Sequence, residues 1–95
     1  MEQSLTMLEH ELTVTNKLGL HARATAKLVQ TMSKFQSNTT LSTKGREVNA
    51  KSIMGVMLLA ASQGTVIRVR IDGEDEHTAM QALSELFENR FNEDT

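Results

Sequence analysis

His21 is the residue of this sequence whose type and position are best suited to chemistry. It stands between a loop that contains Gly19 and a segment, starting at Ala22, that has the composition of a helix. The first turn of a helix has unpaired N–H groups and the positive end of the helix dipole, so it favours an anion such as phosphate. Arg23 adds a guanidinium whose donors match phosphate oxygens. Since a neutral imidazole nitrogen is a competent nucleophile, these residues predict a site that binds or accepts a phosphoryl group.

The same residues are also compatible with a histidine that only hydrogen-bonds the backbone at a helix start. No Asp or Glu stands beside His21 in the sequence, so local spacing predicts no carboxylate that would orient the ring. A metal site is not expected, because no second ligand follows four residues along the helix and cysteine is absent. Of the other histidines, His10 is interpreted as a packed residue of a strand and His77 as an exposed residue of a helix start.

Length and composition limit the possible functions. The chain has 95 residues, which is enough for one small domain but leaves no room for a second hydrophobic core. The net charge of −2 and the three aromatic residues, all Phe, argue against nucleic-acid binding, including RNA binding by a small α+β domain. No run approaches the roughly 20 apolar residues of a membrane span, and the polar N-terminus does not resemble a secretory signal. We therefore expect a cytoplasmic protein without membrane insertion.

The elements that must position His21 follow from the hydrophobic pattern. Alternating and helical spacings predict the order strand, helix, strand, strand, helix, strand, helix, over residues 8–15, 22–33, 38–43, 46–50, 53–61, 65–71 and from about Asp75 onward. Lys44-Gly45 is expected to form the hairpin turn and Ser52 to cap the second helix. Residues 1–7 are predicted to be a flexible tail and residues 8–92 the folded domain. The pattern alone predicts an α+β fold in which helices cover one face of a mostly antiparallel sheet.

Two segments resemble the HPr family of phosphocarriers of the bacterial phosphoenolpyruvate-dependent phosphotransferase system. Residues 16–24, Asn-Lys-Leu-Gly-Leu-His-Ala-Arg-Ala, are similar to the active-site segment of the family. Residues 49–57, Asn-Ala-Lys-Ser-Ile-Met-Gly-Val-Met, are similar to its second signature, around a regulatory serine. The separation of the two segments also matches, and the likeness extends over about residues 8–91. The resemblance implies an HPr-like open-faced β-sandwich, with four antiparallel strands covered on one face by three helices in the order β-α-β-β-α-β-α.

The resemblance also implies roles for individual residues. His21 matches the histidine that phosphorylated enzyme I modifies on Nδ1, with phosphoenolpyruvate as the original donor. Arg23 matches the arginine that neutralises the phosphoryl group, and the backbone amides of Ala22 and Arg23 match those that bind it. Ser52 matches the serine that HPr kinase/phosphorylase modifies in some bacteria. A phosphate on Ser52 would bring about −1.5 to −2 charge beside apolar residues and weaken docking there.

A docking surface is implied as well. In the family, partners press on an apolar patch between the histidine and the second helix, which corresponds here to Leu20, Ile53, Met54 and Met57. Methionine is adaptable, which suits a surface that docks to several partners. Some of these residues could instead fill the core, but a helix this short cannot bury all of its apolar side chains.

One departure from the family pattern is visible at Ala24, where the family usually has proline. Proline fixes φ at a value that suits the first turn of a helix, whereas alanine adopts that value without enforcing it. We expect the phosphorylation chemistry to survive, because proline supplies no donor or acceptor to the phosphate.

The predicted function is that of a phosphoryl carrier without cofactors and not an enzyme in the strict sense. It accepts the group from enzyme I and passes it to a histidine of an A-type (EIIA) domain, for sugar uptake or regulation, and we expect it to be a monomer. Two alternatives remain at this point. One is the nitrogen-branch carrier of the same family, NPr, and the other is a protein-interaction module that uses the same face without being phosphorylated.

Overall fold

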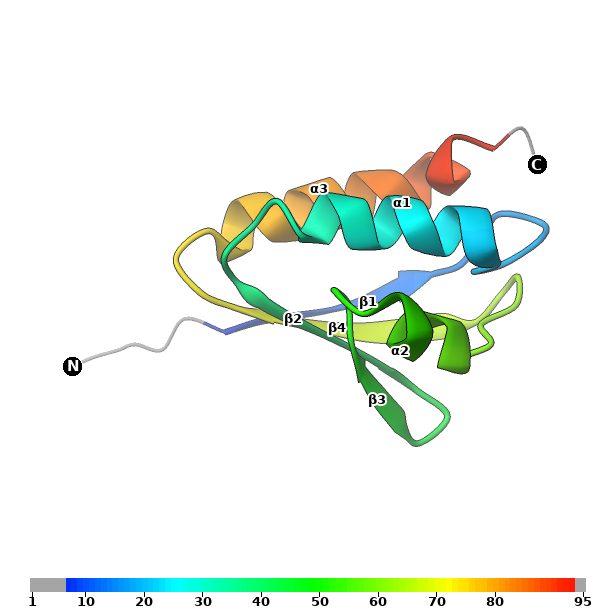
Figure 1. The fold of residues 1–95 in the computed structure, drawn as a ribbon, viewed down its shortest axis with the longest axis horizontal. Coiled ribbons are helices and arrows are strands. Elements are labelled where there is room, and N and C mark those ends of the chain that lie inside the picture. The colour runs from blue at the N-terminus through cyan, green and yellow to red at the C-terminus, as the bar shows by residue number, and fades with distance from the viewer. Residues whose placement is uncertain (1–6, 94–95) are drawn as a thin grey trace.

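A four-stranded antiparallel sheet forms one layer of the molecule, and helices form the other (Figure 1). The computed structural model describes residues 7–93. The strands and helices are, in chain order, β1 (Leu8–Thr13), α1 (Ala22–Met32), β2 (Asn38–Thr43), β3 (Arg46–Asn49), α2 (Ile53–Leu58), β4 (Val66–Asp72) and α3 (Glu76–Glu88), followed by a short helical turn, η1 (Arg90–Asn92). This order confirms the predicted α+β fold.

The strand order in the sheet is β1-β4-β2-β3, so β4 lies between the first two strands of the chain. In this register Val69 lies opposite His10 of β1 on one side and Leu41 of β2 on the other. Side chains alternate between the two faces of a sheet, and the fully buried Ile67, Val69 and Ile71 place the apolar face of β4 toward the core. The predicted alternation in this strand is confirmed.

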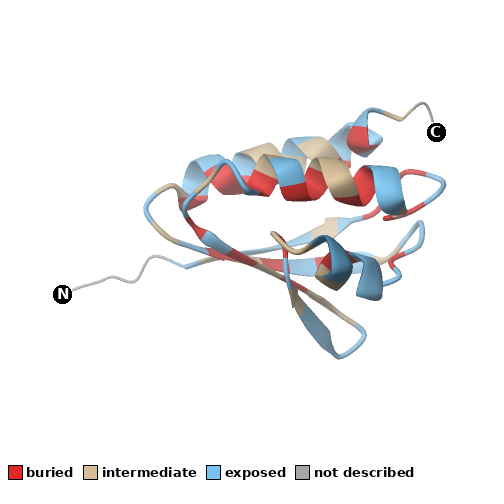
Figure 2. Ribbon diagram, viewed as in Figure 1, coloured by how far each residue is buried: buried red, intermediate tan, exposed pale blue. Residues whose placement is uncertain are grey.

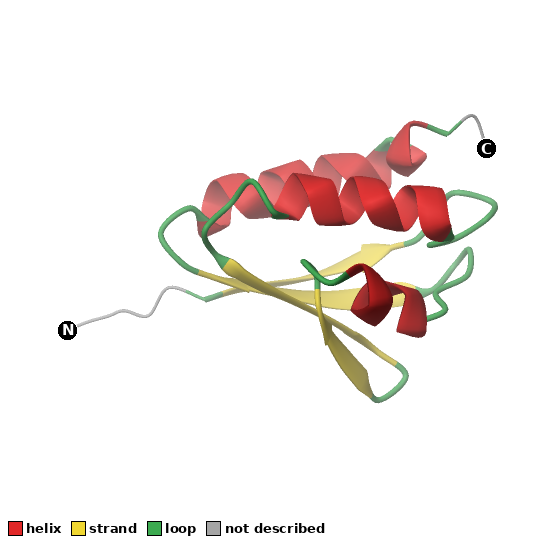
Figure 3. Ribbon diagram, in the orientation of Figure 1, coloured by secondary structure: helices red, strands yellow, loops and turns green. Residues whose placement is uncertain are grey.

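Helices α1 and α3 lie side by side on the apolar face of the sheet, and the shorter α2 packs beside α1 and β3 (Figures 1 and 3). The buried side of each helix faces the sheet, whereas much of α2 is exposed (Figure 2). The largest fully buried apolar side chains of the core are Phe91, Leu28, Met32, Leu41, Ile67, Ile71, Leu83, Val14, Val56 and Val69. No helix within residues 7–93 is long and apolar enough to cross a membrane.

Several strand and helix boundaries differ from the predicted ones. Strand β1 ends at Thr13, two residues before the predicted end, and α2 ends at Leu58 although the prediction extended it to Ala61. The helix stops early because Ala60 takes a left-handed conformation with φ of 48°, which turns the chain away from the helix axis. The predicted tail, residues 1–7, lies outside the described residues except for the exposed Met7.

The interpretation of His10 as a packed residue is wrong, because its side chain is exposed. It lies opposite the buried Val69, but β1 is an edge strand of the sheet and is less completely covered than the central strand β4. His77 is exposed, as predicted.

Candidate functional site

The loop before α1 is held tightly against the chain that follows α2. The N–H of Leu20 donates to the carbonyl of Ala61 at 2.8 Å, and the N–H of Gly19 donates to the carbonyl of Asn16 at 3.1 Å. Gly19 has φ of +70°, a region in which glycine is far less strained than other residues. These contacts fix the direction in which the chain enters α1 and therefore the position of His21.

His21 is the N-cap residue of α1. Its backbone is extended, and its Nδ1 atom accepts a hydrogen bond from the N–H of Arg23 at 3.3 Å. Its side chain is 29% exposed, so the ring is supported on one side and open to solvent on the other. The imidazole thus lies at the positive end of the helix dipole, among N–H groups that have no partner within the helix.

A carboxylate that the sequence did not predict contacts Nε2, the other nitrogen of the His21 ring. Nε2 of His21 is 2.5 Å from Oε2 of Glu93, a residue 72 positions later in the chain. The other carboxylate oxygen accepts from Nδ2 of Asn16 at 3.0 Å, and the same amide group donates to the carbonyl of Gly19 at 2.7 Å. Burial raises the pKa of Glu93, but the hydrogen bonds from Asn16 and His21 outweigh this effect and hold the pKa below its ordinary value.

Glu93 reaches the site through the turn η1, which lies beside α1 (Figure 1). Three consecutive non-glycine residues of this turn, Arg90, Phe91 and Asn92, have φ between 52° and 64°. The side chain of Phe91 is fully buried, with its ring centroid 5.1 Å from that of Phe87, and Nζ of Lys27 donates to the Phe91 carbonyl at 2.7 Å. Burial of Phe91 and the lysine contact offset the strain of this left-handed backbone, which costs roughly 1–3 kcal/mol per residue.

Arg23 is exposed at the second position of α1, and within residues 7–93 its guanidinium makes no ion pair. It borders the same surface pocket as His21, together with Ala22, Lys27 and Glu93. A phosphoryl group on the ring would therefore have a cation within the same pocket. This agrees with the predicted grouping of His21, Ala22 and Arg23.

Ser52 is the N-cap of α2, as predicted, and its Oγ accepts from the N–H of Gly55 at 3.0 Å. Helix α2 itself presents apolar side chains to solvent: Ile53 is 52% exposed, Met54 75%, Met57 42% and Leu58 59%. We name these four residues the α2 patch. Leu20 does not join this surface, because it is only 5% exposed and belongs to the core. Of the four residues predicted for docking, Ile53, Met54 and Met57 are therefore exposed, whereas Leu20 is buried, and Leu58 is an exposed apolar residue that the prediction did not include.

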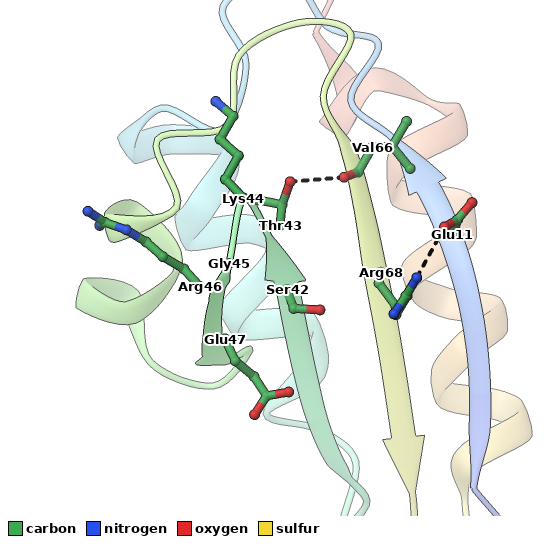
Figure 4. A pocket seen from close by; sticks show the side chains of 9 residues that line it. All are labelled: Glu11, Ser42, Thr43, Lys44, Gly45, Arg46, Glu47, Val66 and Arg68. Carbon is green, nitrogen blue, oxygen red and sulfur yellow. Dashed lines mark hydrogen bonds and ion pairs between the residues drawn. The ribbon is translucent and has the colours of Figure 1, made fainter.

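A second pocket lies on the open face of the sheet and contains none of the predicted site residues (Figure 4). The charges there are opposed, since Arg68 lies 3.8 Å from Glu11 and 3.5 Å from Glu9. Among residues 7–93, no three His, Asp or Glu side chains form a group that could hold a metal ion. The surroundings of His21 therefore remain the site with the clearest chemistry.

Comparisons with known proteins agree with this geometry. Residues 8–89 match the family described as "PTS HPr component phosphorylation site". The chain is 99% identical over 89 residues to the phosphocarrier protein HPr of Xylella fastidiosa, covering 94% of this chain and all of that protein. It is 54% identical over 87 residues to HPr of Cupriavidus necator, covering 92% and 98%. Among solved structures, HPr-C-His from Thermoanaerobacter tengcongensis superposes with a TM-score of 0.89 at 45% identity, covering 93% and 99%.

Proposed function

Because the chain belongs to the HPr family of phosphocarriers of the phosphotransferase system, we propose that His21 is the residue on which it carries the phosphoryl group. The family membership makes the protein a phosphotransfer intermediate and not a catalytic enzyme. The observation that carries the assignment to His21 is its position as the N-cap of α1, with Nδ1 turned toward the helix N–H groups.

The proposed reaction follows from that position. The lone pair of Nδ1 attacks the phosphorus of phosphorylated enzyme I, a bond from Nδ1 to phosphorus forms, and the bond to the donor breaks. The N–H groups of Ala22 and Arg23 and the guanidinium of Arg23 then stabilise the phosphoryl oxygens. The pocket is open at the surface, which suits a carrier because the group must leave again for a histidine of an EIIA domain.

We assign docking of enzyme I and of EIIA domains to the α2 patch. The start of α1 and the whole of α2 lie toward the same end of the molecule (Figure 1). Large exposed apolar residues next to a reactive group are typical of an interaction surface. Ser52 begins the same helix, so a phosphate from HPr kinase/phosphorylase would place charge at the edge of this surface. A cytoplasmic, monomeric protein is consistent with these partners.

The decisive experiment combines the protein with enzyme I and phosphoenolpyruvate and measures the intact mass. The wild type should gain one phosphoryl group, and the adduct should be labile in acid and stable in base, as a phosphoramidate is. His21→Ala should gain none, whereas His10→Ala and His77→Ala should react like the wild type. A modified His21→Ala protein, or an unmodified wild type with an enzyme I of proven activity, would contradict the proposal.

Two further measurements separate the alternatives. Phosphorylation rates with enzyme I of the sugar branch and of the nitrogen branch identify the cognate donor. A partner that is regulated equally well by His21→Ala would favour the interaction module that acts without phosphorylation.

A further inference from the structure

The geometry points to Glu93 as a positioning residue that holds the proton of His21 on Nε2 and thereby leaves Nδ1 unprotonated, as a nucleophilic nitrogen must be. This inference rests on the proposed role of His21 and adds a residue outside the matched family region, which ends at residue 89. The carboxylate acts through the ring and does not contact the phosphoryl group.

The two hydrogen bonds of the imidazole determine where its proton lies. The backbone N–H of Arg23 only donates, so Nδ1, at 3.3 Å, must be the accepting nitrogen. A neutral imidazole has one N–H, which then lies on Nε2 and points at the carboxylate of Glu93, 2.5 Å away. Both contacts therefore favour the same tautomer, and the lone pair of Nδ1 lies at the helix N-terminus where an anion is stabilised.

The carboxylate also matters during transfer. When Nδ1 forms its bond to phosphorus, the ring that keeps its Nε2 proton becomes an imidazolium, and the nearby negative charge stabilises that cation. The proton stays on Nε2 throughout, and the donor leaves with the electrons of the bond that breaks. In the second transfer the same protonated ring is the leaving group, so Glu93 assists both directions. A carboxylate that orients a catalytic histidine in this way recurs in hydrolases.

The surroundings of Glu93 indicate a held carboxylate and not a loose surface contact. Its side chain is 13% exposed, and its second oxygen is fixed by Asn16, whose amide also binds the carbonyl of Gly19 in the loop before His21. The left-handed turn at Arg90–Asn92 and the buried Phe91 bring the residue to this place. The Asn16 amide thus links the carboxylate of Glu93 to the loop before His21, and the carboxylate and the loop together hold the imidazole in one orientation.

The test compares wild type, Glu93→Ala and Glu93→Gln, with Glu88→Ala as a matched control. Glu88 is exposed at the end of α3, so Glu88→Ala removes the same charge from the same end of the chain without touching the ring. The ring nitrogens of His21 are followed by ¹⁵N NMR at a pH where the imidazole is neutral. We expect the Nε2–H tautomer in the wild type and in Glu93→Gln, whose amide oxygen still accepts, and a mixture of tautomers in Glu93→Ala.

The kinetic measurement is the rate of phosphorylation by enzyme I. Since Glu93→Ala removes the charge that stabilises the imidazolium, kcat should fall by about tenfold. The KM of enzyme I for this protein should stay unchanged, because Glu93 is not in the α2 patch. Glu93→Gln should lie between Glu93→Ala and the wild type, since it keeps the tautomer but not the charge. Glu88→Ala should match the wild type in both measurements.

Unchanged ¹⁵N shifts or an unchanged kcat in Glu93→Ala would overturn the inference, and so would an equal loss in Glu88→Ala. Failure here is distinct from failure of the proposed function, which depends on whether His21→Ala is phosphorylated. Thermal unfolding of each variant excludes a loss of fold as the cause, and Glu93→Gln keeps the test available if Glu93→Ala is unstable.

Discussion

Gly19 passes so close to Ala61 that a Cβ atom on Gly19 would lie 2.5 Å from the Ala61 carbonyl oxygen. The same carbonyl accepts the N–H of Leu20, the residue directly before His21. The position of the imidazole therefore depends on a backbone contact with the loop between α2 and β4, far away in the sequence.

Replacing Gly19 by alanine should both destabilise the protein and displace the histidine. The left-handed φ costs roughly 1–3 kcal/mol for a residue with Cβ, and the clash with Ala61 adds to it. Gly45→Ala is a matched control, because Gly45 also has positive φ, at +78°, but a Cβ atom added there would meet nothing within 4 Å. Urea unfolding should show a larger loss for Gly19→Ala than for Gly45→Ala, and phosphorylation by enzyme I should slow only in Gly19→Ala. Equal losses would mean that the contact with Ala61 is not important.

Two substitutions of Ser52 should separate its contribution to stability from its effect on docking of enzyme I. Ser52→Ala removes the acceptor for the Gly55 N–H and should cost about 0.5–2 kcal/mol of stability, measured by thermal unfolding. Ser52→Asp keeps a good capping side chain but adds charge beside the α2 patch, so it should retain stability and bind enzyme I more weakly. Tight binding of enzyme I by Ser52→Asp would argue against regulation through this residue.

Met54 is the most exposed residue of the α2 patch, at 75%. Met54→Lys should leave the free energy of unfolding within about 0.5 kcal/mol of the wild type, because the side chain packs little. If the α2 patch docks enzyme I, the KM of enzyme I for this protein should rise by about fivefold or more. Replacing an important interface residue commonly costs over about 1 kcal/mol of binding free energy, which corresponds to such a change. Gln81→Lys, which places the same charge on the exposed face of α3, should change neither quantity.

Ala24 occupies the third position of α1, where the N–H has no partner within the helix. Ala24→Pro should therefore lose no helical hydrogen bond and should gain about 0.4–1 kcal/mol by restricting the unfolded chain. Ala24 is fully buried, so a decrease in Tm would show that its neighbours leave no room for the proline ring. Phosphorylation by enzyme I should stay close to the wild-type rate.

The hydrogen bonds of Asp75 should make the stability of the folded protein depend on pH in a definite direction. Its carboxylate accepts from the hydroxyl and N–H of Ser37 and from the N–H of Gln36, and these hydrogen bonds, the Ser37 hydroxyl first, hold the pKa of Asp75 below its ordinary value. A carboxyl with a lowered pKa in the folded state stabilises the protein fully above its unfolded pKa, about 3.9. That stabilisation is lost as the pH falls through the lower folded pKa.

The variant Asp75→Asn should thus have a lower Tm than the wild type at pH 7, and the difference should shrink as the pH falls below about 4. Glu74→Gln, at an exposed neighbouring position, is the control and should show a small difference. A Tm difference for Asp75→Asn that stays constant down to acidic pH would contradict this account.

Local patterns in the sequence predicted most of the fold. The alternation of Ile67, Val69 and Ile71 identified β4, the Lys44-Gly45 pair identified the hairpin turn, and Ser52 identified the start of α2. Each of these signals acts within a few residues, where local chemistry decides the structure.

The errors concern properties that depend on the assembled molecule. The exposure of His10 follows from its strand lying at the edge of the sheet, and the burial of Leu20 follows from packing of its loop. The contact of Glu93 with His21 spans 72 positions and passes through a left-handed turn that contains no glycine. No spacing in the sequence encodes such a contact, so the carboxylate at the site could not be predicted.

The place of β4 in the sheet has a consequence for synthesis of the protein. Strand β1 leaves the ribosome first, but its partner in the sheet is β4, whose first residue is Val66. Until β4 has been synthesised, no strand lies between β1 and β2. Their apolar faces and unpaired edges are then accessible to proteases and to other chains. Folding should therefore be nearly all-or-none after translation, and a product truncated before Val66 should be degraded instead of persisting as a folded fragment.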